Sequence, residues 1–501
     1  MLKIQQTKTV CDDIFVCFGR TEFGKFAPDS DEVIFKALND NFDMTVNGVP
    51  AAVRECRVSA IPFNRPWPGK QRPFSQSESA GYVSFSSDEA VELRVKSKKS
   101  FSYATVRPLS RNISPEIKGE EVVFTLKEHG SYTLELDGSH NVLHIFFDPV
   151  KEYKDAEAAT KYFGPGIHFP GIIDLRDNDV VYIDRDAIVF GSINSTGAKN
   201  VRIFGGGVID NSCEEVMVEN AYENFSKGCF RIYNCENVRV EDIILTNSST
   251  WSLSMFNCKN ISIENVKIVG QWRYNTDGID IVNSEDVHVR SCFVRSFDDA
   301  VTLKAIYDYD KPMKNITVED SVFWCGWGKT CEIGIETFGI EYKDIIFRNC
   351  DLIHNSSCAL GVVNGCHANV HDVLFENMRI EFQRDTLPEV DQMSDEDVYD
   401  GWNERKNPRF VHISNFKYAI RRKSISGLVI EKCAYGKIRD ITFKNIKVVC
   451  DDDTIIPKVY AVSDDEPFEN IVFEDISLNG EKIKDFESFE TEIRNVNMII
   501  R

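Results

Sequence analysis

The chain has 501 residues, and 42% of them are apolar, which is enough to bury a large core. Its 79 acidic and 58 basic residues give a formal charge of −21, which excludes the binding of nucleic acid or an anionic membrane by bulk electrostatics. No stretch reaches the roughly 18 consecutive apolar residues of a membrane-spanning helix.

The N-terminus has no basic segment followed by an apolar run, so we predict no secretion signal. The 15 cysteines form no C-x-x-C pair, and they predict neither a disulfide framework nor a zinc ribbon. Several lie in strand-like runs, which indicates small buried apolar residues in a reducing compartment. We therefore expect a cytoplasmic protein.

Residues 1–148 contain short runs in which apolar and polar residues alternate, at 91–95, 131–136 and 142–147. Turn signals separate the runs, such as Asn47-Gly48 and Asp137-Gly138. This pattern predicts an antiparallel β-sandwich. The charged, Ala-rich segment that follows predicts a connector over 149–161 with a short helix.

One unit recurs from residue 162 onward: a charged residue, Asn or Asp, and then alternating apolar and polar residues. Most steps between units are 23–30 residues, and a repeat of this period without a helical pattern is typical of one coil of a parallel β-helix. Leucine-rich repeats have a similar period but need a leucine ladder, which is absent. We predict an all-β protein with a right-handed parallel β-helix over 162–501. The Asn/Asp anchors are Asn200, Asn237, Asn260, Asp286, Asn315, Asp344, Asp372, Asp440 and Asn470.

The step from Asp372 to Asp440 is much longer than the others and predicts an insertion at about 384–430. Its acidic core, 384–410, is interpreted either as a loop that shapes a binding pocket or as a solvated surface loop.

Four acidic residues are spaced as if they met at one place. Asp277 and Asp298 are 21 residues apart, close to one coil, so their backbones should stack about 4.8 Å apart. Asp299 is adjacent to Asp298, and Asp280 is close to Asp277. Crowded carboxylates raise one another's pKa, and a protonated acid beside ionised carboxylates suits glycoside hydrolysis. A Ca²⁺ site and ordinary Asp-rich turns are the alternatives.

The segment 275–280 (NTDGID) and the pair Asp298-Asp299 resemble the signature of family 28 glycoside hydrolases, the polygalacturonases and rhamnogalacturonases. The segments 162–168, 181–191 and 204–210 are similar to that group as well. A β-sandwich ahead of a β-helix is similar to the family 49 dextranases and isopullulanases. The resemblance implies hydrolysis with inversion at the anomeric carbon, with Asp298 as the general acid. It also implies that Asp277 and Asp299 hold and activate the water.

The sequence departs from the polygalacturonase pattern twice. Where those enzymes carry Gly-His-Gly, this chain has Gly326-Trp327-Gly328. Where they carry Arg-x-Lys, which grips a uronate carboxylate, the segment 358–364 (CALGVVN) has no basic residue. A uronate needs a cationic partner, so the second departure points to a neutral sugar.

Other residues near the acidic motifs are predicted to bind substrate, although each has a structural alternative. The alternatives are packing at a coil corner for Trp327, pairing with Lys329 for Glu332 and Glu336, and a place in a surface turn for His367. The predicted substrate-binding residues are Asn275, Asp280, Arg273, Lys304, Lys329, Glu332, Glu336, His367 and Trp327.

We therefore predict an inverting, exo-acting glycoside hydrolase that cleaves an α-linked oligo- or polysaccharide built of neutral or non-galacturonate sugars. It needs no cofactor or metal, its partner is the carbohydrate substrate, and nucleic acid and membrane are excluded; monomer and homo-oligomer stay open. The alternatives are a polysaccharide lyase with Lys304 or Lys329 as base, and a non-catalytic β-helix that binds glycans.

Overall fold

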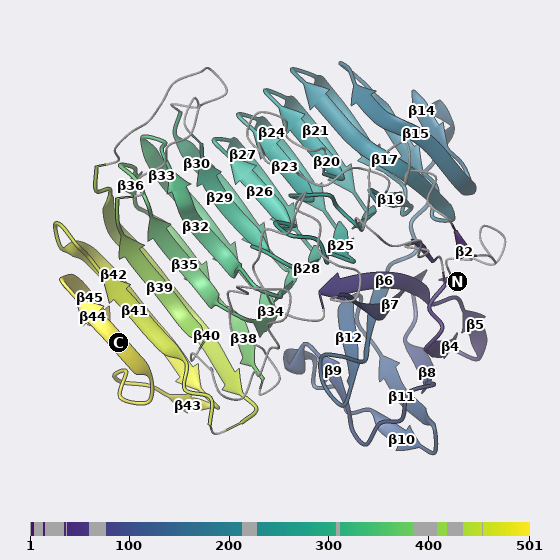
Figure 1. Cartoon of the computed structure of the whole chain (residues 1–501), viewed down its shortest axis with the longest axis horizontal. Helices are drawn as coiled ribbons and strands as arrows, with labels where there is room; N and C mark the ends of the chain where they lie inside the picture. The colour runs from purple at the N-terminus through teal and green to yellow at the C-terminus, as the bar shows by residue number, and fades with distance from the viewer. Residues whose placement is uncertain are drawn as a thin grey trace, which may run out of the picture.

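The computed structural model describes residues 2–4, 14–15, 35–36, 38–59, 77–212, 228–306, 311–383, 408–417, 434–452 and 454–501. In these ranges the chain is built of strands, with two 3₁₀ turns at Leu109–Arg111 and Ala156–Ala158. No helix of these ranges is long and apolar enough to cross a bilayer. Figure 1 shows a small β-sandwich beside the first coils of a long solenoid, and the fold is thus the predicted sandwich followed by a right-handed parallel β-helix.

The sandwich consists of two mainly antiparallel sheets that enclose an apolar core, to which Val95, Phe124 and Ile145 contribute. Strand β8 alternates buried and exposed residues, as expected when one face of a sheet meets the core. A separate pair, β2 (Ile14–Phe15) and β3 (Phe35–Lys36), is antiparallel. The first sheet contains β1 (Lys3–Ile4), β6 (Arg54–Ser59), β7 (Ser77–Ser86), β9 (Ala104–Arg107), β12 (Gly130–Leu136) and β13 (Val142–Asp148). The second contains β4 (Phe42–Val46), β5 (Val49–Ala51), β8 (Val91–Ser97), β10 (Glu116–Lys118) and β11 (Glu121–Leu126).

The solenoid has three parallel faces, and its first long strands, β15 (Gly166–Leu175) and β17 (Ala187–Thr196), run across two of them. The face that packs on the sandwich, the sandwich-facing sheet, contains β19 (Val208–Asp210), β22 (Ile244–Thr246), β25 (Lys267–Val269), β28 (Phe293–Ser296), β31 (Val322–Cys325), β34 (Asp351–Asn355) and β38 (Arg379–Phe382). The next face, the acid-bearing sheet, contains β20 (Phe230–Tyr233), β23 (Leu253–Phe256), β26 (Ile279–Val282), β29 (Val301–Ala305), β32 (Lys329–Thr337), β35 (Cys358–Asn364), β39 (Arg409–Asn415), β41 (Lys458–Val462) and β44 (Glu490–Arg494). The third face, the ladder sheet, contains β14 (Lys161–Phe163), β16 (Val180–Ile183), β18 (Lys199–Phe204), β21 (Glu236–Glu241), β24 (Lys259–Glu264), β27 (Glu285–Arg290), β30 (Met313–Glu319), β33 (Glu341–Arg348), β36 (Asn369–Val370), β37 (Val373–Glu376), β40 (Lys437–Cys450), β42 (Phe468–Leu478) with its hairpin partner β43 (Glu481–Lys482), and β45 (Val496–Ile500).

The inside of the solenoid is filled by the apolar residues of the repeat, which stack coil upon coil. Four phenylalanines, Phe347, Phe375, Phe443 and Phe473, form one such column with ring centroids 5.0, 5.0 and 4.7 Å apart. Because equivalent residues repeat at every coil, each ring meets its own copy on the next rung, and burial of these rings stabilises the stack.

The Asn and Asp anchors of the repeat all adopt the left-handed backbone conformation, with φ between 52° and 59°. Asn and Asp tolerate this conformation better than other non-glycine residues, because their short side chains hydrogen-bond locally. The anchors also bond to one another along the ladder sheet: Asn260 Nδ2 donates to Asn237 Oδ1 at 2.6 Å, and Asn237 Nδ2 donates to Asn200 Oδ1 at 3.0 Å. The anchors therefore turn the chain and hold successive coils in register.

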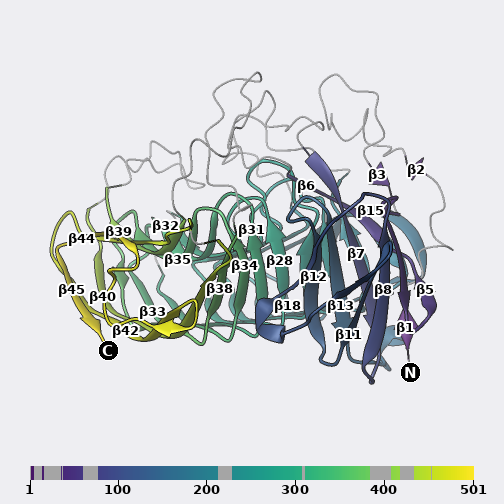
Figure 2. The same cartoon turned by 90° about the horizontal axis from the view of Figure 1, so that it is seen from below.

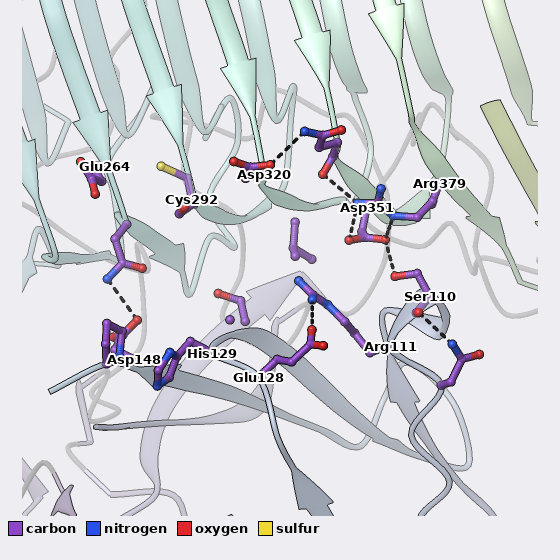
Figure 3. Close-up of a pocket in the computed structure, with 18 of the residues that line it drawn as sticks. Ser110, Arg111, Glu128, His129, Asp148, Glu264, Cys292, Asp320, Asp351 and Arg379 are labelled. Atoms are coloured by element: carbon purple, nitrogen blue, oxygen red, sulfur yellow. Dashed lines mark hydrogen bonds and ion pairs between the residues drawn. The ribbon is translucent and has the colours of Figure 1, made fainter. Parts of the chain in front are cut away.

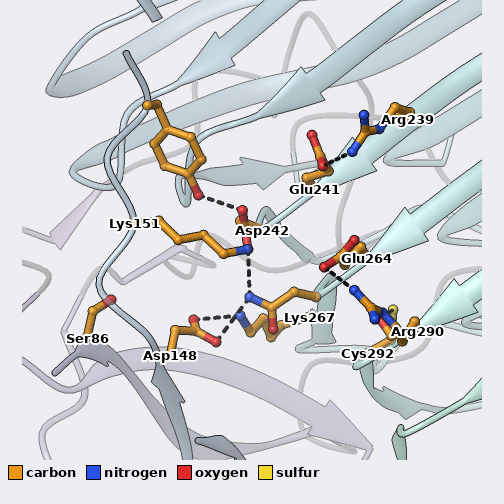
Figure 4. A network of polar contacts seen from close by, with 12 residues as sticks. Ser86, Asp148, Lys151, Arg239, Glu241, Asp242, Glu264, Lys267, Arg290 and Cys292 are labelled. Atoms are coloured by element: carbon orange, nitrogen blue, oxygen red, sulfur yellow. Dashed lines mark hydrogen bonds and ion pairs between the residues drawn. The ribbon is translucent and has the colours of Figure 1, made fainter. Parts of the chain in front are cut away.

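The sandwich lies flat against the sandwich-facing sheet (Figure 2). Apolar side chains from both partners, such as Tyr82 and Phe146 on one side and Phe293 on the other, make a shared core. Polar contacts border this core (Figure 4): Lys267 Nζ lies 2.7 Å from Asp148 Oδ2, and Lys151 Nζ lies 2.7 Å from Asp242 Oδ1.

A buried group of charges, which we call the Arg107 cluster, joins the two parts deeper in the interface. Arg107 donates from Nε to Glu135 at 2.8 Å and from Nη1 to Glu381 at 2.6 Å. His354 Nε2 lies 2.5 Å from the other oxygen of Glu135, and its ring stacks on Trp324 at 3.7 Å. Each carboxylate of the cluster therefore has a basic partner.

Among the described residues ten cysteines are free, and nine of these are buried. Five of the ten lie in strands and the other five lie directly before the first residue of a strand. Burial raises the pKa of Cys292 to about 12. Cys366 is an exception because it is disulfide-bonded, so the expectation of reduced cysteines fails at this position.

Candidate active site

The predicted acidic residues lie where two neighbouring coils enter the acid-bearing sheet. Ile279 of β26 pairs with Val301 of β29, so Asp277 and Asp299 occupy equivalent positions on successive rungs. The Gly278 N–H donates to the Asp299 carbonyl at 2.8 Å, which ties the two turns together. The regular length of the coil thus places the side chains of one acidic motif above those of the other.

Lys304 lies at the centre of these carboxylates. Its Nζ is 2.5 Å from Asp277 Oδ2, 2.9 Å from Asp280 Oδ1 and 3.7 Å from Asp299 Oδ2. We call these four residues the Lys304 cluster. Its single ammonium faces three carboxylates, so the cluster carries a surplus of negative charge when all three are ionised.

Asp298 lies beside this cluster but outside its ion pairs. Its Oδ1 accepts a hydrogen bond from the Asp299 N–H at 3.0 Å, and among the described residues no lysine or arginine forms an ion pair with it. Asp298 and Asp299 are partly exposed, whereas Asp277 is only 2% exposed. Asp298 therefore differs from its neighbours in having no cation at ion-pair distance.

The surroundings of the acidic side chains raise the pKa values of several of them. Burial and the neighbouring Asp299 carboxylate raise the pKa of Asp298 well above its usual range. Burial also raises the pKa of Asp277, but the ammonium of Lys304 at 2.5 Å opposes that rise. Burial raises the pKa of Asp280 to about 6. Burial disfavours a charged Lys304, yet its three carboxylate neighbours outweigh burial and raise its pKa well above the ordinary value.

The Gly-Trp-Gly segment, which replaces Gly-His-Gly, packs directly against the acidic pair. A Cβ on Gly328 would lie 2.5 Å from Asp299 N and 2.6 Å from Asp298 Oδ1, so only glycine fits here. The half-buried Trp327 stacks on Phe297 with ring centroids 5.9 Å apart. This coil thus holds the two acids in place from the C-terminal side.

Lys329 and Glu332 form a second pair on the next rung. Lys329 Nζ lies 2.7 Å from Glu332 Oε1, and the Lys329 N–H donates to Asp299 Oδ1 at 2.9 Å. Burial raises the pKa of Glu332 to about 7, even though Lys329 lowers it. Lys329 therefore touches the catalytic region with its backbone, while a carboxylate neutralises its side chain.

Several predicted substrate-binding residues are placed where a sugar cannot touch them. Arg273 is 0% exposed and donates from Nη2 to the Ser212 carbonyl at 2.9 Å, so the predicted direct contact is not found. Asp280 and Glu332 are also fully buried, and they act on Lys304 and Lys329 instead. The prediction that these three residues bind substrate could not take their burial into account, because sequence spacing does not reveal depth.

The remaining candidates are at least partly accessible. Asn275 and Glu336 are half-buried, and Asn275 adopts the left-handed conformation with φ 59°. His367 is exposed and lies next to the disulfide-bonded Cys366, beyond the end of β35. Most of the predicted insertion, 384–407 and 418–433, lies outside the described residues.

The position of Lys304 argues against two alternative functions. Its ammonium occupies the place between Asp277, Asp280 and Asp299 that a Ca²⁺ ion would need. A lyase needs a lysine base with a lowered pKa, whereas carboxylates raise the pKa of both Lys304 and Lys329.

A separate cavity of about 740 Å³ lies between the sandwich and the solenoid (Figure 3). Two ion pairs lie on its wall: Arg379 holds Asp351, with Nη2 at 2.8 Å from Oδ2, and Arg111 holds Glu128 at 2.7 Å. None of the residues of the Lys304 cluster lines it, so we do not assign it to catalysis.

Trp251 lies on the N-terminal side of the acids. It precedes β23, on the rung before Asp277, and Lys304 Nζ lies 4.1 Å from its ring centroid. On the other side, β39 brings Arg409 and His412 onto the acid-bearing sheet. Sequence reasoning missed these two residues, because the insertion before β39 hides their register.

Comparison with known proteins agrees with the fold and the site. The model of the glycosyl hydrolases family 28 matches residues 164–419, which include both acidic motifs. A rhamnogalacturonase A of Emericella nidulans is 28% identical over 293 residues, which are 52% of this chain and 55% of that protein. A probable rhamnogalacturonase A of Aspergillus oryzae is 31% identical over 147 residues, 29% of this chain and 30% of that protein. The chain thus matches between 30% and 55% of the length of these two curated relatives.

Among solved structures, Dex49A from Penicillium minioluteum has the same fold, with a TM-score of 0.62 and 12% sequence identity. The superposition covers 92% of this chain and 94% of Dex49A, so it includes the sandwich as well as the solenoid.

Proposed function

This chain belongs to the glycosyl hydrolases family 28, and from that premise we propose that it is an inverting glycosidase that acts on the end of an α-linked oligo- or polysaccharide. The observation that carries the proposal is that Lys304 pairs with some of the carboxylates but not with Asp298. Asp277 and Asp299 share its ammonium, whereas no lysine or arginine among the described residues forms an ion pair with Asp298. Burial raises the pKa of both Asp277 and Asp298, and the ammonium at 2.5 Å from Asp277 opposes the rise there.

In this mechanism Asp298 keeps its proton near neutral pH and donates it to the glycosidic oxygen as the bond to the anomeric carbon breaks. One of the two carboxylates held by Lys304, Asp277 or Asp299, takes a proton from a water molecule that attacks the anomeric carbon from the opposite face, and the other orients that water. An inverting reaction needs about 6.5–9.5 Å between acid and base to admit that water.

Exo action is supported by the outward face on the N-terminal side of the acids. There the rung before Asp277 carries Trp251, which is 7% exposed, and the adjacent column holds Phe256 and Val282, both 0% exposed. These residues pack as an apolar cluster, which would limit the room for further sugar units directly beside the acids on this side. A chain would then approach from the C-terminal coils, and the acids would cut near its end.

A neutral sugar at the cleavage point is supported by the pairing of the nearby lysines. Lys304 is shared by three carboxylates, and Lys329 is paired with Glu332. Strand β35, one rung further on, has no basic residue. A carboxylate on the cleaved sugar would therefore find no free cation beside the acids.

The names of the curated relatives make rhamnogalacturonan oligosaccharides the first substrates to test, alongside neutral α-linked oligosaccharides. Wild-type protein should release end sugars, and proton NMR should show the inverted anomer as the first product. The Asp298→Asn variant should lose about 10²–10⁴-fold in kcat with an unchanged circular dichroism spectrum. Full activity of this variant would refute the assignment of the acid, and a retained anomer would refute inversion.

A further inference from the structure

The acid-bearing sheet continues past the acids into a group of cationic and aromatic residues on its outward face. The register places Arg409 and Lys458 in one column with Lys329, and His412 and Tyr460 in the column of Glu332. We call Arg409, His412, Lys458 and Tyr460 the Arg409 cluster; β39 and β41, which carry it, follow β35 in Figure 1. With rungs about 4.8 Å apart, Arg409 lies three rungs, or about 14 Å, from Asp299.

Tyr460 forms the middle of the cluster. The His412 ring meets it edge-on with centroids 4.9 Å apart, and Arg409 Cζ and Lys458 Nζ lie 5.7 and 5.6 Å from its ring centre. The ring is only half-buried, so it offers an apolar surface of the kind on which sugar C–H groups pack, flanked by positive charge.

The cluster contains polar atoms that the protein leaves unmatched. The guanidinium of Arg409 forms no hydrogen bond or ion pair with any residue that the structure describes, and its Nε is buried without an acceptor. His412 Nδ1 is likewise buried without a partner, while its Nε2 meets Ser414 Oγ at 2.9 Å. A buried polar atom without a partner is destabilising, and in a native protein it calls for an explanation, such as a water or a ligand that satisfies it.

The charges around Arg409 distinguish it from the lysines nearby. Lys458 is held by Glu490 and Glu492 at 3.3 and 3.2 Å, and Lys329 is held by Glu332. Burial and the cations Arg409, Lys329 and Lys458 lower the pKa of His412 well below its ordinary value, so the imidazole is neutral at pH 7. Among the residues that the structure describes, Arg409 is therefore the cation of this cluster whose side chain has no ion pair.

We propose that the Arg409 cluster is a subsite for an acidic sugar unit, in which the guanidinium of Arg409 binds the sugar carboxylate and the ring of Tyr460 supports its apolar face. Arginine is suited to this role because its fork matches the two oxygens of a carboxylate. The proposal rests on the proposed glycosidase function and adds to it. The substrate would carry a neutral sugar at the cleavage point and a uronate several units away, toward the C-terminal coils.

The test compares rhamnogalacturonan oligosaccharides with the same oligosaccharides after chemical reduction of their carboxylates to alcohols. Wild-type protein should have a kcat/KM at least 10-fold higher for the carboxylated set, and Arg409→Met should lower that kcat/KM by about 10–100-fold. The reduced set should be unaffected by the substitution. Arg409→Lys, which keeps the charge but loses the fork, should fall between the two. Arg439→Met, on the ladder sheet and paired with Asp440, serves as the matched control without effect.

Binding separates a failure of this proposal from a failure of the glycosidase assignment. Calorimetry with Asp298→Asn should show tighter binding of the carboxylated set, and adding Arg409→Met should remove the difference. If wild-type protein hydrolyses neither set, the glycosidase proposal fails for this substrate class, but the binding comparison still decides the subsite. Equal affinity for both sets, or no binding of either, overturns the subsite, as does an equal effect of Arg409→Met on both.

Discussion

The two buried charge clusters of this protein lie on different faces of the same solenoid and balance their charges differently. In the Arg107 cluster, between sandwich and solenoid, Arg107 and His354 meet the carboxylates of Glu135 and Glu381. In the Lys304 cluster one ammonium meets three carboxylates. Buried carboxylates that each have a basic partner hold a particular geometry, whereas carboxylates that outnumber their cation compete for protons. Burial raises the pKa of Glu381 to about 7 even in the Arg107 cluster, so the number of partners, and not protonation, distinguishes the two clusters. Charge balance thus separates an interface from a candidate catalytic centre.

The largest expected effect comes from removing the cation of the Lys304 cluster. Lys304→Met should lower kcat by about 10²–10⁴-fold, because Asp277 would lose the ammonium that opposes the rise of its pKa and Asp299 would lose the cation beside it. Steady-state hydrolysis of oligosaccharides, with near-ultraviolet circular dichroism as a fold check, measures this. Lys314→Met, which removes a half-exposed lysine of the ladder sheet, should leave kcat unchanged. A normal kcat for Lys304→Met would show that the charge surplus is not used in catalysis.

The corresponding change in the Arg107 cluster should act on stability alone. Arg107→Met leaves two buried carboxylates without their guanidinium and should lower the free energy of unfolding by about 3–5 kcal/mol. Denaturant unfolding measures this, and kcat of the folded variant should stay close to that of wild type. Arg494→Met, which removes an exposed arginine, should cost less than about 1 kcal/mol. Equal losses in the two variants would contradict a structural role for the cluster.

The Arg107 cluster should also make the stability of the protein depend on pH. Burial alone would raise the pKa of Glu135, but His354 and Arg107 outweigh it and lower the pKa from 4.5 to about 2. The unfolded chain therefore binds a proton here that the folded chain does not, and the stabilisation present above pH 4.5 is lost as the pH falls toward 2. The stability difference between wild type and Glu135→Gln should shrink by about 3 kcal/mol over that window. A difference that does not vary with pH would mean that Glu135 has an ordinary pKa in the folded protein.

The smallest expected effect comes from a substitution at the glycine that packs against Asp298 and Asp299. Gly328→Ala would place a Cβ 2.5 Å from Asp299 N, and displacing the pair should lower kcat by about 10²-fold. Gly326→Ala, whose Cβ would meet its nearest atom at 3.2 Å, should cost much less. Kinetics of the two variants side by side measure the difference, and equal kcat values would show that the acids tolerate the shift.

The repeat made the solenoid predictable, because each coil must supply its own turn and its own inward apolar residues. The spacing of Asn237 and Asn260 therefore reveals a coil, and the step from Asp277 to Asp298 reveals two acids on neighbouring rungs. The same reasoning did not recognise that Arg273 and Asp280 are buried, because in a turn the direction of a side chain depends on the local backbone.

From the sequence alone, the period of the repeat and the spacing of the acidic motifs settle the fold class and the identity of the crowded carboxylates. Both are local properties of a chain that contacts mainly its own neighbouring coils. The tertiary structure decided which cation holds those carboxylates and which face the sandwich covers. It also decided that Arg409 returns to the acid-bearing sheet after a long insertion, since contacts between distant segments leave no periodic trace in the sequence.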